Sequence, residues 1–415
     1  MKILEINVFN YRKGGSEAVY FNTIELLKDH GNDVINFSLK WKENEYSSQE
    51  LYFPESKETR QGIFKQINNI VGYFYHQEAA HKLESLIKTE KPHIAQIHLL
   101  WGQITGSILP VLKRYNIPVV FTIHEYRIVC PAYTFRNGKG EVCEQCQGKH
   151  FYKCITNKCC KSNYGLSAMM AAEQYFRNTF FNPAKYIDGF VYVSQFAKNK
   201  LEQYMPTLKE KPNIVLYNMA DNFKSIEDIT PKKDKYFLFF GRLSHEKGIN
   251  TLINAFKETP DCKLKIAGTG PLEEELKSFV QQNNINNIEF LGYQSGKSLE
   301  DLIEGAYFIV VPSEWYENNP MTIIEGYAAA VPVIGSYIGG IPEIIVHGKT
   351  GYLFESSNMD ELVTLIKQTS SLSDDSYNKL CINALEFAMQ HFNKSKYYHT
   401  LMDFFNEITI FNNKI

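Results

Sequence analysis

The sequence lacks a strong excess of charge of either sign. Its 415 residues include 44 Lys and Arg against 46 Asp and Glu, a formal net charge of −2. Proteins that bind nucleic acid present a strongly basic face, so the composition indicates no nucleic-acid partner. With 44% hydrophobic and 22% charged residues, the chain has the composition of a folded globular protein, which excludes wholesale disorder.

Long apolar runs are missing as well. No segment approaches the roughly 18 uncharged apolar residues that a membrane-spanning helix needs, and Glu5 interrupts the apolar start too early for a signal peptide. We therefore expect a cytoplasmic protein, with the inner face of the membrane as an alternative location. Apolar residues recur at helical spacing through 60–77. This pattern predicts a helix that packs on the core or, alternatively, one that makes a peripheral membrane contact.

Internal repeats and low-complexity tracts are also absent, and the chain is longer than one hydrophobic core usually supports. Short β-rich runs alternate with helical patterns in two series, separated by a polar linker at 221–235. This alternation predicts an α/β fold with two tandem doubly wound, Rossmann-like parallel-sheet domains that face a cleft. The expected domains are residues 1–220 and 221–393, with an aromatic-rich C-terminal helix at 394–415 that packs back on the first domain.

The expected strands are short and mostly apolar. In the first domain they cover 2–9, 33–39, 93–98, 118–123 and 189–193; in the second they cover 236–240, 263–267, 288–291, 308–311 and 333–335.

Two short segments follow expected strands of the first domain. Gly14 and Gly15 lie between the first strand and its helix, where glycine allows a ligand to approach the backbone and the helix N-terminus offers N–H groups to an anion. A tight turn would need glycine there as well, so this signal is weak. His124 follows the strand at 118–123. A lone histidine is usually structural, but its place at a strand carboxyl end favours a catalytic role.

Basic residues follow the first strand of the second domain. Arg242 and Lys247, in the segment Gly-Arg-Leu-Ser-His-Glu-Lys-Gly, come directly after 236–240 and before a helix. Fixed cations at this position can clamp a diphosphate. The alternative is a solvated turn with ordinary surface charges.

The most specific segment is Glu-Asn-Asn-Pro-Met-Thr-Ile-Ile-Glu at 317–325. Asn319 and Pro320 resemble an N-cap and the first residue of a helix. Glu317 then precedes the helix and Glu325 lies in its second turn, so two carboxylates flank exposed backbone N–H groups that can hold a phosphate or sugar hydroxyls. The helix dipole by itself also favours Glu near a helix start.

Six of the eight cysteines lie close together, within about 130–162. In a reducing compartment such a cluster indicates metal before disulfide. Cys130, Cys143, Cys146 and Cys159 are the expected ligands of a structural zinc, with Cys154 or Cys160 as the alternative fourth ligand. An iron–sulfur centre and free or redox-sensitive thiols stay open, because a second Cys-x₂-Cys is missing.

Taken in order, these segments resemble the retaining glycosyltransferases of the GT-B fold, the large bacterial "glycosyl transferases group one" type of polysaccharide and lipopolysaccharide synthesis. The resemblance rests on Gly14-Gly15, the His124 loop, Arg242 with Lys247, and the pair Glu317 and Glu325. Gly268-Thr269-Gly270-Pro271 and Gly339-Gly340-Ile341-Pro342-Glu343 also match it. It covers nearly the whole chain apart from the cysteine-rich segment, which we interpret as an insert in the first domain.

The resemblance implies a reaction and roles for these residues. A sugar passes from a UDP- or GDP-sugar to a glycan, glycolipid or lipid-linked acceptor with retained configuration, and no cofactor is required because Arg242 and Lys247 stabilise the departing diphosphate. Glu317 binds the donor sugar, Glu325 the ribose, and His124 contacts the sugar near its anomeric centre. The backbone of Gly14 and Gly15 and the segment Asn318, Asn319, Pro320, Met321 and Thr322 hold the diphosphate and sugar. Asn318 and Asn319 depart from the small residues common there, which leaves the donor sugar open.

Two other functions fit the same architecture. A nucleotide-sugar epimerase would convert the donor with no acceptor. A non-catalytic nucleotide-sugar-binding scaffold would keep the cleft without turnover, although the joint presence of His124, Arg242, Lys247, Glu317 and Glu325 disfavours it.

Overall fold

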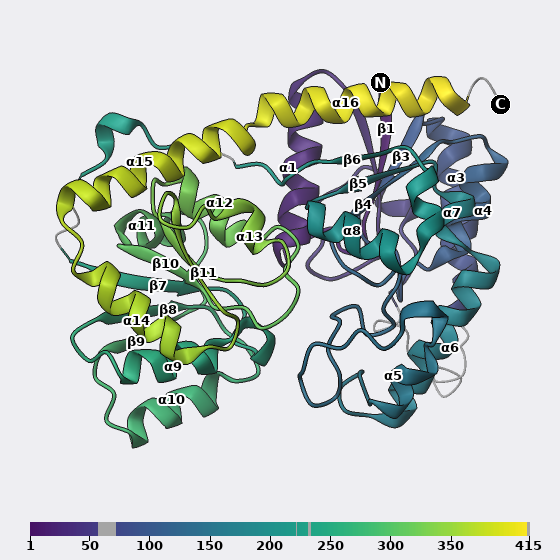
Figure 1. Ribbon diagram of the computed structural model, residues 1–415. Helices are drawn as coiled ribbons and strands as arrows, with labels where there is room; N and C mark the ends of the chain where they lie inside the picture. The colour runs from purple at the N-terminus through teal and green to yellow at the C-terminus, as the bar shows by residue number, and fades with distance from the viewer. Residues whose placement is uncertain (57–71, 221, 231–233, 413–415) are drawn as a thin grey trace. The chain divides into compact units, whose positions relative to one another are not determined.

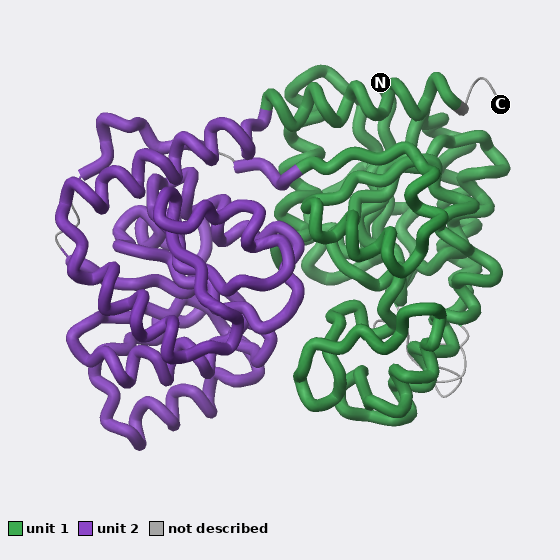
Figure 2. Tube along the Cα trace, in the orientation of Figure 1, with its two compact units in different colours: residues 1–216, 395–415 green, residues 217–394 purple. Residues whose placement is uncertain are grey.

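The computed structural model describes residues 1–56, 72–220, 222–230 and 234–412. The chain forms two compact units (Figure 2): unit 1 comprises Met1–Leu216 with Ser395–Ile415, and unit 2 comprises Tyr217–Lys394. Most of the amphipathic segment expected at 60–77 lies outside the described residues. Within the described residues, no helix is long and apolar enough to cross a membrane.

Unit 1 is built on a six-stranded parallel sheet in the order β2-β1-β3-β4-β5-β6. Its strands are β1 (Lys2–Ile6), β2 (Asp33–Phe37), β3 (Ile94–Ile97), β4 (Val119–Ile123), β5 (Gly189–Tyr192) and β6 (Asn213–Val215). Residues of β3, β4 and β5 are buried along their whole length. Near-continuous apolar runs of this kind are typical of parallel strands covered by helices on both faces.

Helices and 3-10 turns connect these strands (Figure 1). They are α1 (Gly15–Asp29), η1 (Glu50–Tyr52), α3 (Gln77–Glu90), η2 (Gly106–Ile108), α4 (Leu109–Arg114), η3 (Gln147–Lys149), α5 (Tyr152–Thr156), α6 (Tyr164–Phe180), α7 (Pro183–Tyr186), α8 (Gln195–Tyr204), η4 (Pro206–Glu210) and α16 (Lys394–Asn412).

The aromatic side chains of α16 pack on unit 1, which buries Tyr397, Phe404 and Phe405. The Tyr397 hydroxyl lies 3.3 Å from Thr23 Oγ1 of α1. Farther along the helix, Phe404 and Ile408 approach Gly189 of β5 so closely that a Cβ at this glycine would lie 2.8 Å from either side chain. The last helix of the chain therefore covers the sheet that the first strand of the chain helps to form.

Unit 2 has a second six-stranded parallel sheet in the order β12-β11-β10-β7-β8-β9. Its strands are β7 (Tyr236–Phe240), β8 (Lys263–Ala267), β9 (Ile288–Gly292), β10 (Phe308–Val311), β11 (Val333–Ser336) and β12 (Gly351–Phe354). Its helices and turns are η5 (Ile226–Asp228), η6 (His245–Lys247), α9 (Ile249–Lys257), α10 (Glu273–Gln282), α11 (Lys297–Gly305), α12 (Met321–Ala328), α13 (Ile341–Ile344), α14 (Met359–Ser370) and α15 (Asp374–His391).

Each sheet reverses its strand order once. In unit 1 the chain moves from β1 outward to β2 and then returns to β3 on the other side of β1. In unit 2 it moves outward through β8 and β9 and returns to β10 on the other side of β7. Ligands of open α/β sheets bind at such switch points, beyond the carboxyl ends of the strands. The fold therefore indicates one candidate position in each unit.

The sequence-based expectations agree with most of these elements. All ten expected strands are present, and the doubly wound α/β architecture with two parallel sheets is confirmed. The sequence pattern did not predict β6 and β12, which have only 3 and 4 residues. The expected linker contains the short turn η5.

Candidate functional site

In unit 2, side chains meet at the switch point between β7 and β10. Lys247, from the loop after β7, places Nζ 2.7 Å from Oε1 of Glu317, from the loop after β10. Ser313 Oγ and Trp315 Nε1 donate to the same oxygen at 2.8 and 2.7 Å. The Trp315 ring also lies 5.2 Å from Lys247 Nζ. Three side chains from two loops thus hold one carboxylate in place.

The environment of Glu317 keeps it ionised although its side chain is only 8% exposed. Burial by itself would raise its pKa, but the charge of Lys247 and the hydrogen bonds from Lys247, Trp315 and Ser313 outweigh burial and lower the pKa below its ordinary value. All three donors meet Oε1. Within the described residues, Oε2 is therefore the oxygen left to accept a ligand hydroxyl.

Backbone contacts fix the loops around this carboxylate. Gly340 N donates to Glu317 O at 2.7 Å. Gly339 has φ +61°, and a Cβ there would lie 2.3 Å from Glu317 O, so glycine is needed both for the backbone angle and for the close approach. Gly248, at φ +68°, approaches Pro312 O in the same way, at 1.8 Å from its ideal Cβ position. The glycines of the sequence motifs allow neighbouring loops to pack backbone against backbone.

The segment after Glu317 differs from one expectation. The sequence predicted Asn319 as the N-cap of the helix, but α12 begins at Met321 with Pro320 in the cap position and no side-chain cap. Asn319 Oδ1 instead accepts from Asn218 N at 2.7 Å, and Asn218 Nδ2 donates to Asn319 O at 2.9 Å. Asn319 therefore binds a residue 101 positions earlier in the chain, and local sequence patterns do not reveal such a contact.

The other residues of unit 2 that the sequence predicted for the site differ in their exposure. Arg242 is exposed on the loop after β7. Asn318 is buried. Glu325 lies in the second turn of α12 as expected, and it is half-buried together with Met321 and Thr322.

In unit 1, Gly14 and Gly15 are exposed at the start of α1, directly beyond the carboxyl end of β1. His124 follows β4 and is half-buried. Its Nε2 lies 2.9 Å from Nδ1 of His98, and Nε2 of His98 lies 3.0 Å from Oε2 of Glu5. Glu5 and His98 were not among the residues that the sequence predicted for the site. The position of a glutamate inside the otherwise apolar strand Lys-Ile-Leu-Glu-Ile is the sequence feature that could have indicated Glu5.

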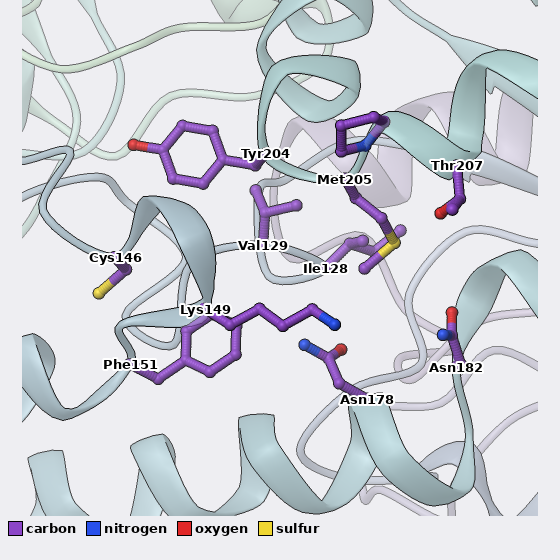
Figure 3. Close-up of a pocket in the computed structure, with 11 residues that line it drawn as sticks. Ile128, Val129, Cys146, Lys149, Phe151, Asn178, Asn182, Tyr204, Met205 and Thr207 are labelled. Atoms are coloured by element: carbon purple, nitrogen blue, oxygen red, sulfur yellow. The ribbon is translucent and has the colours of Figure 1, made fainter.

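The cysteine-rich segment runs between β4 and α6 and docks on α8, where Lys200 Nζ lies 2.7 Å from Glu144 Oε1. It contributes to a pocket of about 200 Å³ in unit 1 (Figure 3). In the figure the Lys149 side chain extends toward Asn178. The lining is mostly apolar and includes Ile128, Val129, Phe151, Tyr204, Met205 and Pro206.

The expected zinc site is not supported. No group of three or more His, Cys, Asp or Glu side chains in the described parts of the chain is arranged to hold a metal ion. Cys130, Cys143, Cys146 and Cys159, with Cys154 and Cys160, are all free thiols. Cys154 Sγ lies 3.9 Å from Cys160 Sγ, and an apolar cluster with Phe151 surrounds them. Burial raises the pKa of Cys130 to about 12, so this thiol packs as a small hydrophobic group.

Comparison with known proteins relates this chain to glycosyltransferases. Residues 221–386 match the family described as "Glycosyl transferases group 1". An uncharacterized glycosyltransferase of Methanocaldococcus jannaschii is 27% identical over 366 residues, which cover 87% of this chain and 86% of the relative. Unit 2 therefore matches the group 1 glycosyltransferase family, and the relative extends the similarity to most of the chain.

Solved structures match the fold along nearly the whole chain. Sucrose-phosphate synthase from Thermosynechococcus elongatus matches with a TM-score of 0.73 and 16% identity, covering 98% of this chain and 99% of that chain. HepE from Anabaena, in complex with UDP-glucose, matches with a TM-score of 0.66 and 16% identity, covering 98% of this chain and 100% of that chain. The fold is GT-B.

Proposed function

We propose that this glycosyltransferase moves a sugar from a nucleoside diphosphate sugar to a glycan, glycolipid or lipid-linked acceptor, with retention of configuration, in polysaccharide synthesis. The observation that carries the proposal is the contact of Lys247 with Glu317 across the β7–β10 switch point. In such a donor, the cation can bind the diphosphate, and the ionised carboxylate beside it can accept hydrogen bonds from the sugar hydroxyls. The complex of Anabaena HepE with UDP-glucose supports a UDP-sugar as the first donor to test.

The donor's diphosphate meets fixed cations in this proposal. Lys247 is held by Glu317 and Trp315 before any ligand arrives, so little reorganisation is needed when negative charge develops on the leaving diphosphate. Arg242, exposed on the same loop, supplies a second charge. These two residues do the electrostatic work for which other transferases use a metal ion, so turnover is expected to be independent of added metal.

The donor sugar and nucleotide meet the segment that begins at Glu317. The free oxygen Oε2 of Glu317 accepts sugar hydroxyl hydrogen bonds, while Glu325 binds the ribose. Backbone groups of 318–322 and of Gly14 and Gly15 hold the diphosphate and sugar. His124 of unit 1 contacts the sugar near its anomeric centre.

Donor binding tests the first half of this proposal. Calorimetry and thermal shift against UDP, GDP, ADP and their common sugar conjugates are expected to show one preferred nucleoside diphosphate. A ligand at 100 times its dissociation constant stabilises the native state by about 2.7 kcal/mol. The absence of any shift would contradict a donor site.

Product analysis tests the second half. With donor and a mixed glycan or lipid-linked acceptor pool, NMR of the product is expected to show the donor's anomeric configuration, and turnover is expected to survive EDTA. Conversion of the donor without acceptor would indicate an epimerase instead. Donor binding without conversion under any condition would indicate a scaffold.

A further inference from the structure

Three titratable side chains form a row at the switch point of the unit 1 sheet. Glu5 lies in β1, His98 directly after β3, and His124 directly after β4. The two hydrogen bonds that join them measure 3.0 Å for Glu5 Oε2 with His98 Nε2 and 2.9 Å for His98 Nδ1 with His124 Nε2. Glu5 and His98 are 0% and 1% exposed, whereas His124 is half-buried. The row therefore leads from the protein interior to the carboxyl edge of the sheet.

The surroundings of Glu5 and His98, the two buried members of the row, contain no opposite charge among the described contacts. From α1, the Tyr20 ring packs edge-on against His98, with ring centroids 5.4 Å apart. The titratable groups near Glu5 are Tyr20 and Tyr397 of α16. The Glu5 charge contributes to the raised pKa of both tyrosines, and Glu45 contributes to that of Tyr20. Glu5 Oε1 is buried and has no hydrogen-bond partner among the described residues.

This environment determines where the protons lie. An ionised Glu5 beside a protonated His98 would place two charges in the interior and leave one carboxylate oxygen unsatisfied, which costs several kcal/mol of desolvation. The neutral arrangement avoids that cost. Burial accordingly raises the pKa of Glu5 and lowers the pKa of His98 to about 3. Burial, with His98 as the second cause, also lowers the pKa of His124.

In the neutral row one direction leaves no buried proton without an acceptor, because Glu5 Oε1 has no partner among the described residues and the acid proton therefore lies on Oε2. The Glu5 carboxylic acid donates from Oε2 to His98 Nε2. His98 then carries its proton on Nδ1 and donates to His124 Nε2. His124, whose Nε2 is now an acceptor, carries its own proton on Nδ1. The tautomer of the half-buried ring is thus set by a carboxylic acid two side chains away.

We propose that Glu5 and His98 are positioning residues that hold His124 as a neutral imidazole with its proton on Nδ1. The ring then meets the substrate as a hydrogen-bond donor that can stabilise an oxygen gaining negative charge, and it does not act as a cation or through Nε2 as a base. This inference rests on the proposed role of His124 in sugar transfer. No proton leaves the row, because its departure would leave Glu5 ionised in the interior.

Nitrogen-15 NMR of histidine-labelled protein tests the tautomer directly, with His124→Gln to assign the signals. At neutral pH the wild-type His124 is expected as a neutral Nδ1–H tautomer. His98→Phe removes the donor to Nε2, so the tautomer is expected to redistribute. A wild-type His124 that is protonated on Nε2, alone or as an imidazolium, would overturn the proposal.

Kinetics add a second readout. His98→Phe and Glu5→Leu are expected to lower kcat by roughly 10–100-fold, the usual cost of losing a partner that orients a functional histidine, with donor KM changed by less than about threefold. Glu5→Gln is expected to recover most of kcat, because its amide N–H donates to His98 Nε2 in place of the acid. Equal losses in Glu5→Gln and Glu5→Leu would overturn the directional role.

Gln96→Leu is the matched control. Gln96 lies in β3, is buried, and donates from Nε2 to Thr122 Oγ1 at 2.7 Å, so its loss removes a comparable buried hydrogen bond without touching His124. A loss of kcat in Gln96→Leu equal to that in His98→Phe would show a structural effect only. If wild-type protein shows no sugar transfer, the proposed function fails, while the NMR measurement still judges the tautomer.

Discussion

Lys247 Nζ and Glu317 Oε1 lie 2.7 Å apart although 70 residues separate them in the chain. The two loops that carry them leave β7 and β10, adjacent strands on either side of the point where the sheet reverses its order. The pair therefore joins the early and late halves of unit 2 at the position where α/β sheets bind ligands.

Removal of the cation at this pair is expected to slow transfer strongly while the fold stays intact. Lys247→Met should lower kcat by about 10²–10³-fold, the usual cost of losing one fixed group that stabilises developing negative charge. The matched control is Lys263→Met, which also breaks a lysine–carboxylate pair, with Asp234 at 2.8 Å, but on an exposed surface. Steady-state kinetics and circular dichroism measure both variants. Wild-type rates in a folded Lys247→Met variant would contradict the diphosphate role.

Glu317 is expected to contribute stability that disappears in acid. Its folded-state pKa lies below the ordinary value of 4.5, so the unfolded chain binds the proton first as pH falls. The contribution is full above about pH 4.5 and is lost as pH falls through the lower folded pKa. Urea unfolding of wild type and Glu317→Gln from about pH 7 down to 3 is expected to show a stability difference that shrinks in acid. A constant difference would show that Glu317 is not held as an ion.

Glu5 should have the opposite dependence. Burial raises its pKa above the ordinary value of 4.5, so the folded protein keeps a proton that the unfolded chain releases. The free energy of unfolding then falls as pH rises, by up to about 1.4 kcal/mol per pH unit. Glu5→Gln removes this loss and should gain on wild type as pH rises above the ordinary value of 4.5. Parallel curves for the two proteins would contradict a protonated Glu5.

A methyl group at Gly339 is expected to disturb the donor site through the backbone of Glu317. Gly339→Ala forces alanine into the left-handed backbone conformation at φ +61°, which costs stability, and also places Cβ 2.3 Å from Glu317 O. Gly348→Ala is the matched control, because Gly348 has φ +74° and nothing within 4 Å of its Cβ position. Each pays about 1 kcal/mol for the backbone, and Gly339→Ala should lose further stability together with donor affinity. Equal unfolding free energies and equal donor dissociation constants would exclude the loop contact as a determinant of the site.

The sequence by itself determined the fold class and most of the elements. The strands β7 and β10 are apolar runs that end before Gly241 and Pro312, and β8 alternates lysine with apolar residues, so all three follow from the local pattern. The motif residues Lys247 and Glu317 were likewise identified from their places after strands. Local pattern was insufficient for β6, whose three residues are all half-buried and carry too little periodicity.

Only the tertiary structure decided which of these residues meet. The order of strands in each sheet brings Lys247 to Glu317, and Glu5 to His98 across 93 residues. It also places Asn319 where its side chain accepts a hydrogen bond from Asn218 and does not cap the start of α12. The cysteine spacing indicated a metal site, yet no three or more His, Cys, Asp or Glu side chains of the described chain are arranged to hold a metal ion. Proton positions, ion pairs and side-chain convergence depend on distances and burial across strand neighbours, and neighbours in a doubly wound sheet are not neighbours in sequence.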